Sequence, residues 1–169
     1  MSFLAVFGMF IKPVISPVFN LLTDFIRIPG GSVTAGFSML FLVFASGLTK
    51  KFGTASLMGV IQAFIALNTG ISSIVGLLVF VTYTLPGIAI DVVLCTPLFA
   101  KLPQSERMSL AGAMGVLTGA AFTNMLYYNL SVVPFLLFYL FGILSGGLGG
   151  WFAHKITERI PQQLLNSMR

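Results

Sequence analysis

Six apolar stretches, most of them about 20 residues long, constrain the fold of this chain more than any other feature. A helix needs about 20 mostly apolar residues to cross the roughly 30 Å hydrocarbon layer of a membrane. The runs are continuous rather than alternating, which favours helices over membrane strands. The sequence therefore predicts an all-α integral membrane protein, a six-transmembrane-helix bundle forming one domain. The predicted helices cover residues 2–22, 31–48, 54–67, 72–94, 109–127 and 132–153, and a polar cytoplasmic tail covers 154–169. A helix in the membrane plane before Lys12 is the alternative layout for the N-terminal residues.

The composition excludes several classes of soluble protein. Hydrophobic residues make up 57% of the chain and charged residues only 8%, whereas about a quarter of an ordinary soluble domain is charged. A soluble fold of this chain could not bury so much apolar surface, and it would have too few charged residues to cover its exterior. A cytosolic enzyme, a disordered chain and a nucleic-acid-binding module are therefore excluded, and the lipid bilayer is the expected surrounding.

The basic residues predict the orientation of the bundle. Cytoplasmic connections of membrane proteins are enriched in Lys and Arg. The connections after the second and fourth predicted helices, together with the tail, carry most of the nine basic residues: Lys50, Lys51, Lys101, Arg107, Lys155, Arg159 and Arg169. The opposite side has only Arg27. We therefore expect both termini in the cytoplasm and the protein in the cell membrane.

Side chains suited to catalysis or metal binding are scarce. Both chemistries need clusters of His, Cys, Asp or Glu. The chain has one His, one Cys and four acids, and His154 stands next to Lys155 near the end of the last predicted helix. Cys95 is expected to be a small packing residue. The sequence thus predicts that the chain is not an enzyme and needs no metal or other cofactor.

Two charged residues are predicted to lie within the membrane, where charge is costly and often functional. Lys12 is about halfway along the first predicted helix, and Asp91 lies toward the cytoplasmic end of the fourth. They could neutralise each other, or Lys12 could extend to the headgroups while Asp91 reaches the interface. Proton coupling is the functional alternative.

Small residues recur at four-residue spacing in the last two predicted helices. Such spacing lets helix backbones approach closely, either inside the bundle or against a partner membrane subunit. The last helix carries Gly142, Gly146 and Gly150, and a second row contains Ser145 and Gly149. In the first helix, Ala5 and Gly8 are three residues apart.

In its layout the chain resembles the substrate-binding (S) subunits of energy-coupling-factor vitamin transporters, closest to the hydroxymethylpyrimidine/thiamine type. Three segments carry the resemblance: LPGIAIDVVL over 85–94, SLAGAMG over 109–115 and GILSGGLGG over 142–150. The resemblance implies capture of a trace nutrient outside the cell, followed by docking on a transmembrane coupling subunit and two cytoplasmic ATPases. Thiamine-type members tend to carry acids in the third helix, where this chain has Gln62, so a neutral or weakly polar heterocycle is the expected ligand.

Two other classes of function stay open. A self-sufficient channel or secondary carrier would need no ATPase, although carriers usually show two matched halves and this chain shows none. A structural membrane protein without a ligand is the other alternative.

Aromatic and amide side chains gather at the predicted outer ends of the helices. Rings can stack on a flat heterocycle while amides and hydroxyls bond its edges, although Tyr is also enriched at membrane interfaces where nothing binds. The predicted substrate-binding residues are Asn68, Ser72, Asn124, Tyr127, Tyr128, Asn129 and Tyr139. Asp24 and Arg27 lie in the connection that could form a lid.

Overall fold

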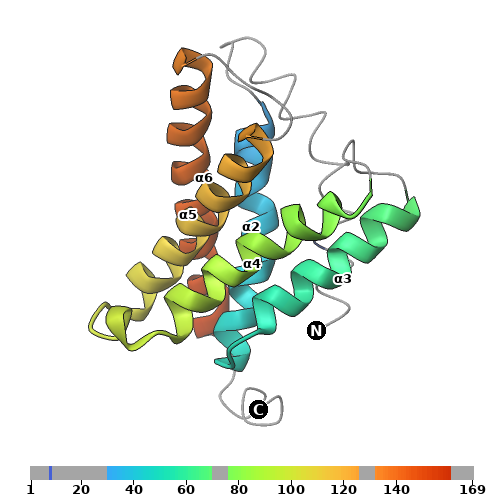
Figure 1. The fold of residues 1–169 in the computed structure, drawn as a ribbon. Helices are drawn as coiled ribbons and strands as arrows, with labels where there is room; N and C mark the ends of the chain where they lie inside the picture. The colour runs from blue at the N-terminus through green and yellow to red at the C-terminus, as the bar shows by residue number, and fades with distance from the viewer. Residues whose placement is uncertain (1–7, 9–29, 70–75, 126–131, 161–169) are drawn as a thin grey trace.

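Helices and the short connections between them make up the part of the chain that the structure describes. The computed structural model describes residues 8, 30–69, 76–125 and 132–160, with labels as in Figure 1. In these ranges it contains no β-strand, which confirms the predicted all-α class. The elements are α2 (Gly30–Thr49), α3 (Thr54–Thr69), α4 (Leu78–Cys95), the 3-10 helix η1 (Pro97–Phe99), α5 (Gln104–Thr123) and α6 (Val132–Arg159).

The observed helix bounds differ from the predicted ones at several ends. Helix α4 begins at Leu78 instead of residue 72, because Gly76 has a positive φ of 78° and lies with Leu77 in a turn. Helices α2 and α3 lie within two residues of the predicted spans 31–48 and 54–67. Helix α5 begins five residues before the predicted start at 109, because Pro103 forms its N-cap and accepts the first backbone hydrogen bond, from Arg107. Helix α6 continues six residues past 153, so the start of the predicted polar tail is helical. The predicted first helix lies outside the described residues except for Gly8.

The connections between the helices alternate between two ends of the molecule (Figure 1). The α2–α3 and α4–α5 connections and the last turns of α6 lie at one end. All charged side chains of the described residues are at this end, which we call the charged end: residues 49–56, 91–107 and 153–160. At the opposite, uncharged end, α3 finishes, α4 begins, α5 finishes and α6 begins.

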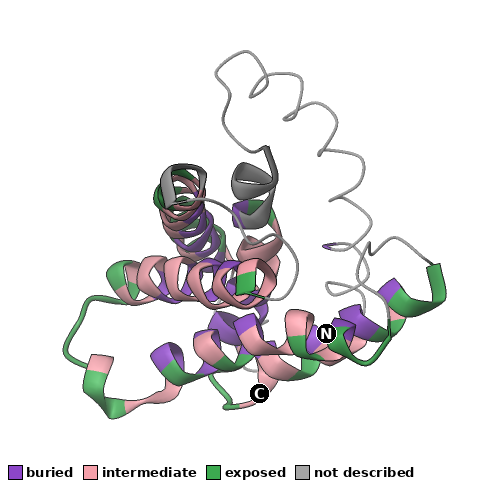
Figure 2. Cartoon of the chain, turned by 45° about the horizontal axis from the view of Figure 1, so that its top comes forward, coloured by how far each residue is buried: buried purple, intermediate pink, exposed green. Residues whose placement is uncertain are grey.

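The helices pack in the order α3, α4, α5, α6, with α2 against α6. Helix α6 contacts α5 and α2, whereas α3 contacts chiefly α4 and lies at the edge of the molecule (Figure 1). Buried residues lie along the helices in Figure 2. One buried cluster, the core, lies at the charged half of the molecule, and smaller clusters lie between α3 and α4 and between α2 and α3. Three of the nine core residues are alanines, which permit close helix approach; the core contains Leu42, Val43, Ala55, Ile90, Val93, Leu94, Met108, Ala111 and Ala153.

The outward faces of the helices are also apolar. On α6 every fourth residue from 136 to 156 is an exposed hydrophobic side chain, namely Leu136, Leu140, Leu144, Leu148, Phe152 and Ile156. Two helices, Leu78–Cys95 and the segment Phe135–Arg159 of α6, are long and apolar enough to cross a membrane. The segments Gly36–Thr49 and Thr54–Thr69 are apolar but shorter. The six-span arrangement stays a prediction.

Candidate functional site

Asp91 is the most constrained polar side chain in the described part of the molecule. Its exposed fraction is 0%, and its two carboxylate oxygens accept four hydrogen bonds. Oδ1 accepts from the Ser46 hydroxyl and the Ala55 backbone N–H, each at 3.0 Å. Oδ2 accepts from the backbone N–H and hydroxyl of Ser56, at 2.9 and 2.7 Å. This arrangement suits a carboxylate, which accepts hydrogen bonds and donates none.

The start of α3 explains why a carboxylate is needed at this place. The first N–H groups of a helix have no partner within the helix, and a preceding Ser, Asp or Asn usually accepts from them. Here Gly53 precedes the helix and has no side chain, and the Thr54 hydroxyl donates instead to the Lys51 carbonyl. Asp91 on α4 supplies the missing acceptor and places negative charge at the positive end of the α3 dipole. The same side chain also binds α2 through Ser46.

This geometry revises the interpretation of the two intramembrane charges. Asp91 is fully buried between α2, α3 and α4, at the charged end of α4, so its carboxylate is satisfied inside the protein. Lys12 lies outside the described residues. The partners of Asp91 are Ser46, Ala55 and Ser56, which were not predicted from the sequence. A role in proton transfer is less favoured, since donors already occupy both carboxylate oxygens. The absence of a capping residue before Thr54 was the signal in the sequence that could have suggested a distant acceptor.

Three of the predicted substrate-binding residues lie in the described part of the chain: Asn68, Asn124 and Tyr139. The others, Ser72, Tyr127, Tyr128 and Asn129, and the predicted lid residues Asp24 and Arg27 lie outside the described residues. The three described residues share the uncharged end but not one neighbourhood. Asn68 stands apart from the other two.

Asn124 and Tyr139 lie on the two helices of one antiparallel pair. Gly142 on α6 faces Val116 on α5, and four residues further Gly146 faces Gly112. The same register, extended toward the uncharged end, places Tyr139 level with residue 119 on α5. Asn124 lies about five residues further along the chain, which is roughly 7 Å along the helix axis. Tyr139 is half-buried, and its ring contacts that of Phe135 with centroids 4.4 Å apart. Rings and an amide therefore lie along the same α5–α6 pair at the uncharged end.

Asn68 lies near the end of α3 and is exposed. Its amide Nδ2 donates to the Phe64 carbonyl one turn earlier, at 2.8 Å. Helix α4 separates α3 from α5, so the end of α3 lies away from the α5–α6 pair (Figure 1). The expectation that Asn68 converges with Asn124 and Tyr139 is therefore wrong for the described residues, because α3 pairs with α4 instead of closing over the bundle.

The row of glycines on α6 lies against α5. A β-carbon at Gly142 would be 2.9 Å from Val116 Cγ1, and one at Gly150 would collide with the Met108 carbonyl. At Gly146 it would lie 2.5 Å from the Gly112 carbonyl oxygen. The second row packs on α2, where the backbones of Gly36 and Gly149 meet. Of the two alternatives for Gly142, Gly146 and Gly150, the structure shows helix packing, since α5 occupies this face.

The first predicted helix offers one described position. Gly8 is buried, and a β-carbon there would lie 3.0 Å from the Phe41 ring on α2. This contact places residue 8 against the bundle, whereas Ala5 lies outside the described residues. A docking role for this pair therefore stays a prediction.

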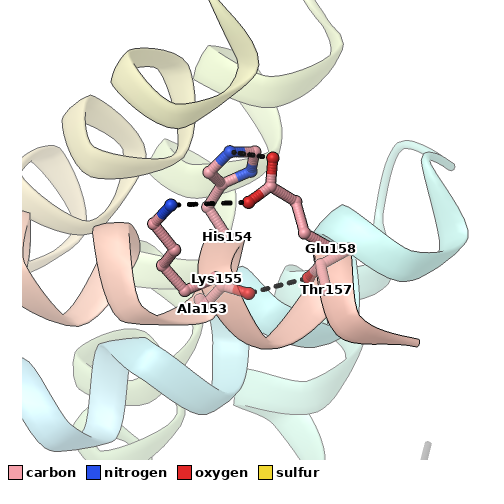
Figure 3. A network of polar contacts seen from close by, with 5 residues as sticks. All are labelled: Ala153, His154, Lys155, Thr157 and Glu158. Carbon is pink, nitrogen blue, oxygen red and sulfur yellow. Dashed lines mark hydrogen bonds and ion pairs between the residues drawn. The ribbon is translucent and has the colours of Figure 1, made fainter.

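The final turns of α6 carry a local network of polar side chains (Figure 3). His154 Nε2 lies 3.3 Å from a Glu158 carboxylate oxygen, and Lys155 Nζ lies 3.7 Å from the other. The Thr157 hydroxyl donates to the Ala153 carbonyl at 2.7 Å. These contacts join residues one turn apart and extend α6 beyond its apolar part. No group of His, Cys, Asp and Glu suited to a metal ion occurs among the described residues.

The comparisons with known proteins yield no relative. No protein-family model, curated protein or solved structure matches the chain.

Proposed function

We propose that the chain is a multi-pass protein of the cell membrane, with six spans and both termini in the cytoplasm. The observation that carries this proposal is the segregation of charge in the described residues. The α2–α3 and α4–α5 connections and the end of α6 contribute exposed lysines and arginines at the same end, while the helices between the ends are apolar inside and outside. Basic connections mark the cytoplasmic side, so the charged end is placed there.

Within this arrangement, we propose that the chain is the substrate-capture subunit of an energy-coupling-factor importer. Support comes from the resemblance in layout and from the three segments that carry it. Two of these segments, 109–115 and 142–150, pack against each other at the α5–α6 crossing. The partners are then a transmembrane coupling subunit and cytoplasmic ATPases, which supply the energy for import.

The proposed substrate is a small neutral or weakly polar heterocycle that enters from outside. The pairing of α5 and α6 at the uncharged end favours a site that includes Asn124 and Tyr139, with Tyr127, Tyr128 and Asn129 in the connection between the two helices. A ring face for stacking and amides for edge hydrogen bonds would supply affinity without charge. Asn68 is left out of this proposed site because α3 is separated from the α5–α6 pair.

We expect the purified chain alone, in detergent, to bind at least one compound from a panel of water-soluble vitamins and pyrimidines. Thermal unfolding should shift on binding, since a ligand at 100 times its Kd stabilises by about 2.7 kcal/mol. For the compound found, Asn124→Ala and Tyr139→Ala should each weaken binding about tenfold, which is the loss of about 1.4 kcal/mol of contact energy. Asn68→Ala is the matched control and should change the Kd less than twofold. Equal weakening by all three variants would contradict the proposed site.

A further inference from the structure

A small cavity opens at the charged end between the last turn of α2 and the first turn of α5. Its volume is about 10 Å³, enough for one water-sized group, and its polar lining includes Lys50, Gln104 and Arg107. Arg107 is half-buried, whereas Lys50 and Gln104 are exposed. The cavity therefore has a half-buried cationic wall and an open rim that carries a lysine and an amide.

The guanidinium of Arg107 has an unmet hydrogen-bonding requirement. Its Nε is buried and has no hydrogen-bond partner among the residues that the structure describes. Burying such a donor without an acceptor costs free energy, so an ion or water is normally found beside it. Among the described residues, Arg107 forms no ion pair: Glu158 binds the α6 side chains, and Asp91 binds α2 and α3.

The end of α2 does not supply the missing acceptor. The Ser46 carbonyl, at the wall of the cavity, already accepts from the Lys50 backbone N–H at 2.9 Å and from the Thr49 hydroxyl at 3.4 Å. The exposed charges on the two adjoining connections, Lys50, Lys51 and Lys101, outnumber the one exposed acid, Glu106. This local excess of positive charge favours an anion over a neutral water as the occupant.

The surroundings of the cavity indicate the source of the anion. The same two connections expose apolar side chains near their lysines: 69% of Phe52 and 76% of Leu98 are exposed, and Leu102 is also exposed. Apolar side chains beside lysines are typical of segments at the boundary between headgroups and acyl chains. Basic pockets between helices on the cytoplasmic side bind anionic headgroups.

We propose that this cavity binds the phosphate group of an anionic phospholipid of the cytoplasmic leaflet. One non-bridging phosphate oxygen enters the cavity beside the Arg107 side chain and pairs with its charge, while the rest of the phosphodiester stays at the rim beside Lys50 and Gln104. Because lysines outnumber acids around the cavity, a phospholipid with a net negative headgroup, such as phosphatidylglycerol, suits it better than the zwitterionic phosphatidylcholine. The proposal depends on the membrane orientation proposed above and is independent of the transported substrate.

The test compares phosphatidylglycerol with phosphatidylcholine added to the purified full chain in neutral detergent. Native mass spectrometry counts retained lipid, and thermal unfolding measures stabilisation. We expect phosphatidylglycerol to be retained by the protein and to stabilise it against thermal unfolding. Arg107→Gln should reduce the affinity for this lipid about tenfold. Arg159→Gln removes the same charge from the end of α6 and should reduce the affinity only slightly. Lys50→Gln, at an exposed position, should reduce affinity as well and serves if Arg107→Gln fails to fold.

Three results would overturn the proposal. Equal retention of the two lipids would show that the headgroup charge is not recognised. Equal losses in Arg107→Gln and Arg159→Gln would show a diffuse attraction to the basic end rather than a site. Stabilisation by millimolar inorganic phosphate equal to that by phosphatidylglycerol, and lost in Arg107→Gln, would assign the cavity to a free anion instead of a lipid.

Discussion

Replacing Asp91 with alanine is expected to lower the free energy of unfolding by about 3–5 kcal/mol, or Tm by about 10 °C. The serine hydroxyls can rotate toward other acceptors, but the backbone N–H groups of Ala55 and Ser56 are fixed in the first turn of α3. Left buried without an acceptor, each costs about 1–3 kcal/mol. The stability of Asp91→Asn should lie between that of the unmodified protein and that of Asp91→Ala. An amide keeps one acceptor oxygen but turns an NH₂ group toward donors. Thermal unfolding of the purified variants measures the effect.

The control for Asp91 is the exposed acid Glu106 at the same end of the molecule. Glu106→Gln removes the same formal charge without leaving a buried donor, so its stability should change by less than about 1 kcal/mol. If Asp91→Ala is as stable as Glu106→Gln, the carboxylate does not hold the start of α3.

The second large effect is expected at the crossing of α5 and α6. Gly146→Ala should destabilise the protein by about 1–3 kcal/mol, because the new β-carbon would lie 2.5 Å from the Gly112 carbonyl oxygen and force the two backbones apart. Gly146→Leu should prevent folding altogether, since the larger side chain has no space at this crossing. Unfolding temperature and yield of monodisperse protein report both effects.

Gly147 offers a matched control one residue away on the same helix. A β-carbon there would lie 3.4 Å from the Ser109 hydroxyl, an ordinary contact. Gly147→Ala gains the same helix propensity, up to about 1 kcal/mol, without a backbone collision, so it should be neutral or stabilising. Similar stabilities for the two alanine variants would mean that α5 does not approach α6 at Gly146.

The helices of the described region follow from local sequence because apolar runs bounded by Gly, Pro and charged residues define them without reference to packing. The starts predicted for α2 and α3 are within one residue of those observed. The polar extensions of α5 and α6 were missed, since a hydropathy argument stops at the first charged residues. Pro103 as N-cap and the Glu158 contacts with His154 and Lys155 continue these helices beyond their apolar runs.

The partners of polar residues were harder to predict than the residues themselves. Asp91 stood out as a charge in an apolar run, but its partners lie 35 to 45 positions away on α2 and α3. Which helix lies beside which is decided by tertiary packing, and the sequence alone does not show it. Asn68 is a second example. Its position near the end of α3 was predicted, but its separation from the α5–α6 pair depends on where α3 packs.

Dependence of uptake on the coupling module tests the central claim most directly. The chain would be expressed in a bacterium that lacks energy-coupling-factor proteins, with or without the transmembrane coupling subunit and its ATPases, and supplied with the radiolabelled compound found in the binding screen. We expect uptake only when the module is present with active ATPases, while the purified chain binds the compound in every case. Uptake by the chain alone that is abolished by collapsing the ion gradient would contradict the account and identify a secondary carrier.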